Sequence, residues 1–219
     1  MSTEPDRGTP PGFWACRGLA DDGSPVWVAG AGSDRHADGE LVELPATDAI
    51  AYLAGATLAV AHLGPEQDVV ALVVTPLGAP KAPPLWFAEL PEPDAAPPAL
   101  NLVAFTGHDV QPGRLLDRGA LRATSARTRD QLGAVRLYPA TGEVDQLYVS
   151  PQWRRQSIGT ALTLAAGILA FARGSSLPWG DGQRTSDGDR MTQASVWRHR
   201  AAPLTHLMPP MTPMDERLD

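Results

Sequence analysis

The sequence predicts an α/β (α+β) domain whose sheet is mixed, mostly antiparallel and flanked by helices. Several short segments rich in β-branched and aromatic residues follow one another between residues 25 and 105, as in antiparallel sheets. A further segment of this kind, residues 144–149, runs through a turn into an apolar helical stretch at 160–171. Several strands followed by one strand–helix unit favour a mixed sheet over a parallel, doubly wound one.

Length and composition suit one domain with tails or two small domains, because 219 residues with 43% hydrophobic content can fill a core. The 18 basic and 25 acidic residues give a net charge of −7, which argues against a broad nucleic-acid-binding surface. Cys16 is the only cysteine, so we expect a reducing cytoplasm and an inert thiol. The polar amino terminus and the short apolar runs predict neither a signal peptide nor a membrane span.

The first half of the chain reads as one helix among strands. Strands are expected at residues 25–30, 68–75, 85–90 and 100–105. Thr47 can cap a helix over residues 48–63, and Gly64-Pro65 forms a conventional stop. The polar stretch 107–132 carries only a weak helical pattern around Leu115, Leu116 and Leu121.

The second half begins with a β-hairpin, because residues 134–138 and 144–149 flank a turn rich in proline and glycine. The stretch 160–171 is apolar on nearly every face and should be buried, with Gly174 at the position of a left-handed cap. Another helix is expected from Ser186 to about residue 198.

The turn between the hairpin and the apolar helix predicts an anion site. The unpaired N–H groups of residues 156–160 and the helix dipole favour a negative charge, and Arg154 and Arg155 add cationic side chains. An ordinary strand–turn–helix with surface arginines is the alternative. Ser157 costs little here if its φ is negative, whereas a positive φ would strain it.

These residues resemble the GNAT family of acyl-CoA-dependent N-acetyltransferases, whose signature is Arg or Gln, two residues, Gly, one residue, then Gly or Ala. Residues 154–159 read RRQSIG, with Ser157 at the first glycine. The likeness covers about residues 134–192. It implies a GNAT-like sheet and acetyl-CoA, or another acyl-CoA, as cosubstrate, with no metal. The residues it assigns to the cosubstrate are Leu147, Val149, Arg154, Arg155, Gln156, Ser157, Ile158, Gly159 and Thr160.

The resemblance also divides the chain. Residues 131–200 correspond to a GNAT-like acyl-CoA-binding core, and residues 13–130 are either the amino-terminal part of this domain or a separate subdomain. Residues 1–12 read as a flexible tail. The Pro- and Met-rich segment 201–219 should pack on the sheet, a partner subunit or the substrate groove.

In the family, an amine attacks the thioester directly, which calls for a base, oxyanion donors and an acid. Glu143 and Asp145 are the candidate bases, because residues two apart share a face of a regular strand, although a bulge could reverse it. The family's usual acid, a tyrosine on a later helix, has no counterpart among Tyr52, Tyr138 and Tyr148. Either water or another residue protonates the thiolate, or Tyr148 helps, or the site binds acyl-CoA without efficient turnover.

The sequence thus predicts a cytoplasmic N-acyltransferase that acts on a primary amine of a small molecule, a peptide or a protein. A GNAT-like acyl-CoA-binding or interaction module without catalysis is the alternative. A structural domain that binds no nucleotide is a third reading. The sequence leaves a homodimer open and predicts neither a membrane nor a nucleic acid as partner.

Overall fold

The computed structural model describes residues 12–31, 36–44, 56–195 and 197–209. Two main sheets make up most of it. The first has the order β3-β1-β2-β4-β5, and its neighbours are antiparallel except for the parallel pair β1–β3. Its strands are β1 (Phe13–Leu19), β2 (Pro25–Ala31), β3 (Leu41–Val42), β4 (Thr57–Leu63) and β5 (Val69–Val74).

The second sheet has the order β11-β10-β9-β7-β6-β8, and only its β6–β8 and β10–β11 pairs are parallel. Its strands are β6 (Trp86–Glu92), β7 (Ala99–Phe105), β8 (Leu115–Leu116), β9 (Gly133–Leu137), β10 (Glu143–Val149) and β11 (Trp179–Gly180). The other elements include the α-helices α2 (Arg118–Arg122), α3 (Ile158–Arg173) and α4 (Ser186–Ala194), the parallel strands β12 (Gln183–Arg184) and β13 (His206–Leu207), and short 3-10 turns.

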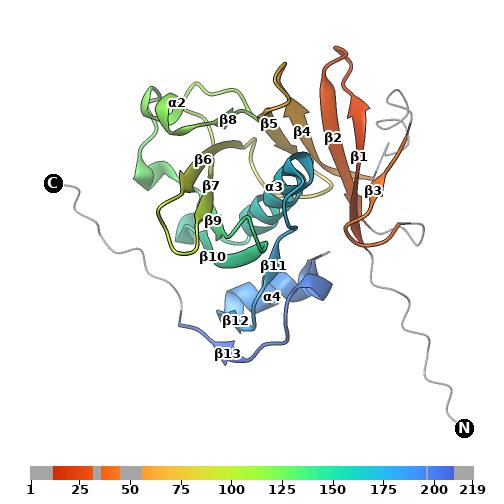
Figure 1. Cartoon of the computed structure of the whole chain (residues 1–219). Helices are drawn as coiled ribbons and strands as arrows, with labels where there is room; N and C mark the ends of the chain where they lie inside the picture. Colours follow the sequence, from red (N-terminus) through yellow and green to blue (C-terminus); the bar gives the residue numbers. More distant parts are fainter. Residues whose placement is uncertain (1–11, 32–35, 45–55, 196, 210–219) are drawn as a thin grey trace, which may run out of the picture.

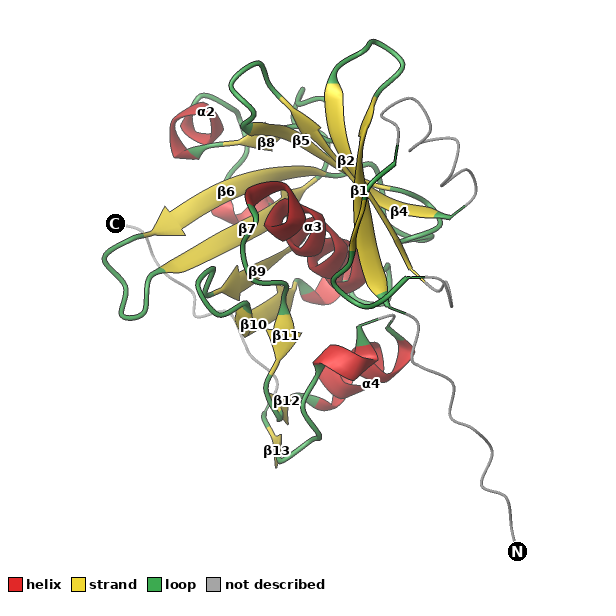
Figure 2. Ribbon diagram, turned by 45° about the vertical axis from the view of Figure 1, so that its right-hand side comes forward, coloured by secondary structure: helices red, strands yellow, loops and turns green. Residues whose placement is uncertain are grey.

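Helix α3 lies between the two sheets, as Figures 1 and 2 show. It contacts β2, β4 and β5 on one side and β7, β9 and β10 on the other. A helix that is apolar on nearly every face can be buried on both sides, and most residues of α3 are buried. Gly174 ends it in the left-handed conformation, and its N–H donates to the carbonyls of Ala170 and Phe171.

The two sheets are linked on one side of α3. Ala71 of β5 forms an antiparallel bridge with Arg114, and the Leu72 N–H donates to the Gly113 carbonyl at 2.6 Å. The Phe87 N–H of β6 in turn donates to the Arg114 carbonyl. The backbone pairing therefore continues from one sheet toward the other around the helix.

The opposite side of α3 is covered by the carboxyl-terminal part of the chain. The Trp197 ring lies 4.1 Å from the Phe13 ring between centroids. A Cβ at Gly167 of α3 would lie 2.6 Å from Trp197 Cη2, so only glycine leaves room for the indole. Phe13 and Trp197 belong to one buried cluster with α3, so residues from both predicted parts of the chain share a core.

A polar anchor holds this cover in place. Asp38 accepts a hydrogen bond from the Phe13 N–H at 2.9 Å, and its carboxylate lies 2.9 Å from His199 Nε2 and 2.7 Å from Arg200 Nη2. Burial raises the pKa of Asp38, but the contacts with Phe13, Arg200 and His199 outweigh it and lower the pKa. The turn at residues 198–200 is thereby fastened to the start of β1.

The predicted class is confirmed, because the structure is a mixed α+β fold with mostly antiparallel sheets. The strands expected at 25–30, 68–75, 85–90 and 100–105, the hairpin and the helix over 160–171 are all present. None of the helices in the described parts of the chain is both long and apolar enough to cross a lipid bilayer.

Other expectations were wrong. Residues 57–63 are strand β4 rather than the end of a helix, since Val60 pairs with Val28 on one side and Val73 on the other. An Ala-rich apolar run suits a buried helix or a buried strand, and here sheet pairing decides. Leu115 and Leu116 form β8 instead of a helix, whereas Leu121 lies in the short helix α2. Thr47, the expected helical residues 48–55 and residues 1–11 of the expected tail 1–12 lie outside the described residues. Gly12, the last residue of that expected tail, is buried against the backbone of Asp38.

The cover over α3 can be tested by truncating its indole. Trp197→Ala should lower the free energy of unfolding by about 3–5 kcal/mol, because it empties a packed aromatic site. Urea denaturation measures this. Trp179→Ala is the matched control, because Trp179 is 36% exposed. This substitution should lower the free energy of unfolding by less than about 1.5 kcal/mol, mostly through loss of the hydrogen bond from Trp179 Nε1 to the Thr141 carbonyl. Equal losses in the two variants would contradict the role given to Trp197.

Candidate functional site

A cleft of about 460 Å³ opens where the end of β10, the amino end of α3 and the first turns of α4 meet. Of the cosubstrate residues predicted from the sequence, all except Gln156 line it, as does Tyr148. Those that line it are Leu147, Val149, Arg154, Arg155, Ser157, Ile158, Gly159 and Thr160. Residues chosen from one short stretch of sequence therefore surround a single cavity.

Strand β10 presents a free edge toward this cleft. It pairs with β9 along one side but with β11 only at Glu143 and Val144, so beyond Val144 that edge has no strand partner among the described residues. The Val149 carbonyl accepts a hydrogen bond from Arg154 Nε at 3.3 Å rather than from a strand. An extended ligand could pair with main-chain groups here as an added strand does.

The two candidate bases lie outside the cleft lining. The pairing of β10 with β9 shifts in register between Val144 and Gln146, so Asp145 falls on a bulge and does not keep the expected alternation with Glu143. Its carboxylate lies 2.7 Å from Arg136 Nη1 and accepts a hydrogen bond from the Tyr138 hydroxyl at 2.9 Å. Glu143 starts the strand next to β11. Among the candidate catalytic residues, only Tyr148 lines the cleft.

The loop that leads into α3 has an unusual backbone. Arg155 and Ser157 have φ values of 61° and 57°, in the left-handed region that favours glycine. Ser157 is the N-cap of α3, but its side chain makes no capping hydrogen bond. The loop thus adopts a glycine-type conformation at Ser157 without a glycine, which is the strained alternative considered for this residue.

Positive charge predominates around the cleft. Lys81, Arg154, Arg155 and Arg190 line it together with a single carboxylate, Asp187. Asp187 pairs with Arg190 in the same helix and lies 3.8 Å from Arg154 Nη1. The hydrogen bond from Arg190 lowers the pKa of Asp187, and the charges of Arg154 and Arg155 add to this effect, so the carboxylate stays ionised. A cleft with this balance suits an anionic ligand.

Helix α4 forms the wall opposite α3. Thr185, rather than Ser186, is its N-cap and accepts a hydrogen bond from the Gly188 N–H at 3.0 Å, and the helix ends at residue 194 instead of 198. A Cβ at Gly159 would lie 2.6 Å from Met191 Sδ, so glycine at this position lets the two helices approach each other. Its contact with Met191 closes the apolar end of the cleft.

Sequence reasoning missed Lys81, Arg190 and Met191. Lys81 could not be assigned to the cleft from the sequence, because it is far from the signature along the chain. It lies between β5 and β6 and reaches the cleft only through the packing around α3. A signal was nevertheless present, because Lys81 is the only lysine of the chain. Arg190 and Met191 lie within the helix expected from Ser186 onward. The position of this helix opposite α3, however, follows from tertiary contacts.

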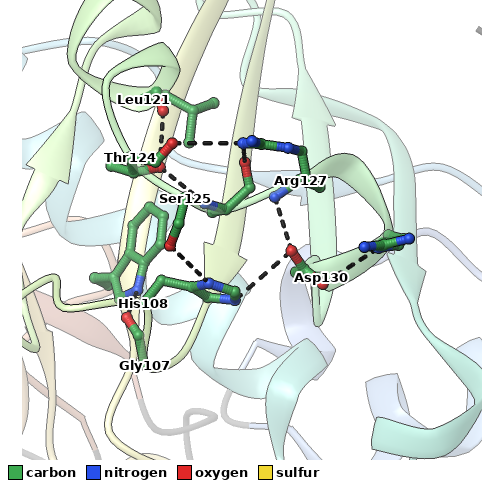
Figure 3. Close-up of polar contacts among 10 residues, drawn as sticks. Gly107, His108, Leu121, Thr124, Ser125, Arg127 and Asp130 are labelled. Carbon is green, nitrogen blue, oxygen red and sulfur yellow. Dashed lines mark hydrogen bonds and ion pairs between the residues drawn. The ribbon is translucent and has the colours of Figure 1, made fainter.

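A second polar cluster combines a serine, a histidine and an aspartate (Figure 3). His108 Nδ1 lies 3.4 Å from Ser125 Oγ, and His108 Nε2 lies 3.7 Å from Asp130 Oδ2. The second distance is too long for a hydrogen bond that would orient a catalytic histidine. Ser125 is exposed, and Asp130 already accepts a hydrogen bond from the Arg127 N–H at 2.8 Å. We therefore assign this cluster to holding the loop after β7.

Catalysis by the Cys16 thiol and binding of a metal ion both find little support. Burial raises the pKa of Cys16 to about 11, so its thiol is protonated near neutral pH and is a poor nucleophile. Within the described ranges, no group of three or more His, Cys, Asp or Glu side chains is placed to hold a metal ion. The cleft beside α3 remains the candidate site.

The loop conformation can be tested at Ser157. Ser157→Gly should raise the free energy of unfolding by about 0.5–1 kcal/mol, because relief of the left-handed strain exceeds the extra entropy of an unfolded glycine. Ser157→Ala is the matched control and should change stability little, since alanine keeps the strain. Chemical denaturation measures both variants. A gain with alanine as large as that with glycine would show that the serine hydroxyl, not the backbone, is unfavourable here.

Comparisons with protein-family models, with curated proteins and with solved structures gave no match to this chain. The assignment of a function therefore depends on the cleft itself. Its features are the free edge of β10, the amino end of α3 and the cationic side chains, with Tyr148 among the lining residues.

Proposed function

We propose that this chain is an acyl-CoA-dependent N-acyltransferase of the GNAT type, with acetyl-CoA as the simplest donor and a primary amine as the acceptor. The observation that carries the proposal is the coincidence of the signature residues with one cleft of positive charge. A cleft that presents a helix amino end and arginines suits the diphosphate of CoA. The free edge of β10 suits the amide-containing pantetheine arm.

The diphosphate and the pantetheine arm of the donor would each have counterparts in the cleft. Arg155 and the N–H groups at the start of α3 would hold the diphosphate, with Arg154 exchanging its contact with Asp187 for a phosphate oxygen. Main-chain groups at Leu147 and Val149 would align the pantetheine amides. Met191 would give apolar contact to the pantetheine arm.

The transfer step needs proton donors and acceptors. The amine nitrogen attacks the thioester carbonyl carbon, the carbon–sulfur bond breaks, and the CoA thiolate takes a proton. Tyr148 lines the cleft and is the proposed donor of that proton. Glu143 and Asp145 remain the candidate bases for the ammonium proton, acting through water because neither lines the cleft.

A second function is favoured by the position of these carboxylates. Asp145 is held by Arg136 and Tyr138 outside the cleft, and the loop before α3 carries Ser157 in a strained conformation. Both features suit a module that binds acyl-CoA without turning it over. Measurements of binding and of turnover separate the two functions.

Binding is tested first by thermal unfolding with acetyl-CoA, free CoA and ADP as a nucleotide control. At about 100 times its dissociation constant, CoA should stabilise the protein by roughly 2.7 kcal/mol, and ADP should stabilise it less. The double variant Arg154→Gln, Arg155→Gln should lose most of the CoA-dependent shift. No shift at millimolar CoA would overturn the proposal in both its catalytic and its binding form.

Turnover is tested with thiol-release detection and a panel of primary amines. Tyr148→Phe should lower kcat by about 10²-fold while leaving CoA affinity unchanged, because the hydroxyl acts only in the transfer step. Tyr138→Phe removes a hydroxyl that binds Asp145 outside the cleft, so it should lower turnover only if Asp145 is the base.

The base is tested by the same assay. Glu143→Gln or Asp145→Asn should reduce turnover at constant CoA affinity if that carboxylate accepts the proton. Wild-type protein that binds CoA but releases no thiol with any amine would favour the binding module over the enzyme.

A further inference from the structure

Lys81 is a cationic residue of the cleft that comes from outside the signature region. It lies in the connection between β5 and β6, is exposed, and lines the same cavity as Arg154 and Arg155. It is the only lysine among 219 residues. Its place in the cleft therefore does not reflect a surface rich in lysines.

The connection that carries Lys81 is fixed against α3. A Cβ at Gly78 would lie 2.7 Å from Leu164 Cδ1, so the backbone packs directly on the helix. Thr75 Oγ1 donates to the Thr57 carbonyl at 2.6 Å and accepts from the Gly78 N–H at 3.2 Å. Ala79 is buried, and its N–H donates to the Thr75 carbonyl at 2.9 Å. Lys81 is thus attached to a rigid part of the cleft wall.

The charges around the cleft leave Lys81 free to bind a ligand. Arg154 and Arg190 already share Asp187. Within the part of the chain that the structure describes, Lys81 and Arg155 have no hydrogen bond or ion pair. These two unpaired cations come from segments more than seventy positions apart in the sequence. A single diphosphate at the start of α3 accounts for Arg154 and Arg155 but leaves Lys81 unused.

We propose that Lys81 binds an additional phosphate of the nucleotide, the 3′-phosphate of CoA, so that the cleft selects 3′-phosphorylated CoA over its dephosphorylated form. This inference rests on the proposed function. An ammonium group recognises a phosphate monoester as a compact point charge and tolerates several approach directions. A phosphate monoester carries nearly two negative charges at neutral pH, more than either phosphate of the diphosphate.

The experiment measures dissociation constants for CoA and dephospho-CoA by isothermal titration calorimetry at 50 mM salt. Wild-type protein should bind CoA about tenfold more tightly than dephospho-CoA, as expected for one partly exposed charge-assisted contact. Lys81→Gln should abolish this preference by weakening CoA alone. Lys81→Arg, which keeps the charge, should retain most of it. The preference of the wild-type protein should decrease as salt increases.

Two further variants make the test specific. Arg155→Gln should weaken both ligands by the same factor, because both carry the diphosphate. Arg122→Gln removes the same charge from α2, away from the cleft lining, and should change neither constant. If Arg122→Gln weakened CoA binding as much as Lys81→Gln does, the effect would be a general charge effect, and the inference would be overturned.

The outcomes distinguish this inference from the function on which it rests. Equal affinity of wild-type protein for CoA and dephospho-CoA would overturn the role of Lys81 and leave CoA binding intact. Equal weakening of both ligands by Lys81→Gln would place the lysine at the diphosphate, which also overturns the inference. If wild-type protein bound neither ligand, the proposed function and the inference would fail together.

Discussion

The burial of α3 on both of its sides is the constraint on which the rest of the structure depends. A helix with apolar residues on nearly every face cannot rest on one sheet and leave its other side in water. Here one sheet covers each side, and Trp197 fills the gap that remains beside Gly167. Residues 57–74, which carry no signature, are therefore as necessary to the core as the hairpin before α3.

The same constraint produces the candidate site. Because α3 is held between the sheets, its amino end is fixed at the place where β10 loses its strand partner. The walls of the cleft come from separate parts of the chain: the β5–β6 connection, the end of β10, the loop at residues 154–157 with the start of α3, and α4. A cleft assembled in this way needs little reorganisation to receive a ligand.

Local patterns could be predicted from the sequence, and long-range pairings could not. The helix over 160–171, its Gly174 cap and the hairpin before it follow from short-range rules and are present. The first sheet was harder, because the run that forms β4 is compatible with either helix or strand until its partners are known. The cosubstrate residues chosen from the signature, apart from Gln156, line one cleft. The signature could not place Lys81, and the bulge at Asp145 altered the expected face of the strand.

The contact between Phe13 and Trp197 has a consequence for the order of folding during synthesis. Phe13 emerges from the ribosome before Trp197, and the ring that covers it belongs to a residue made more than 180 positions later. Until then, the open side of α3 and the start of β1 stay exposed to water and to other nascent chains. Contacts of such long sequence separation slow folding, so closure of this side of α3 should be a late step.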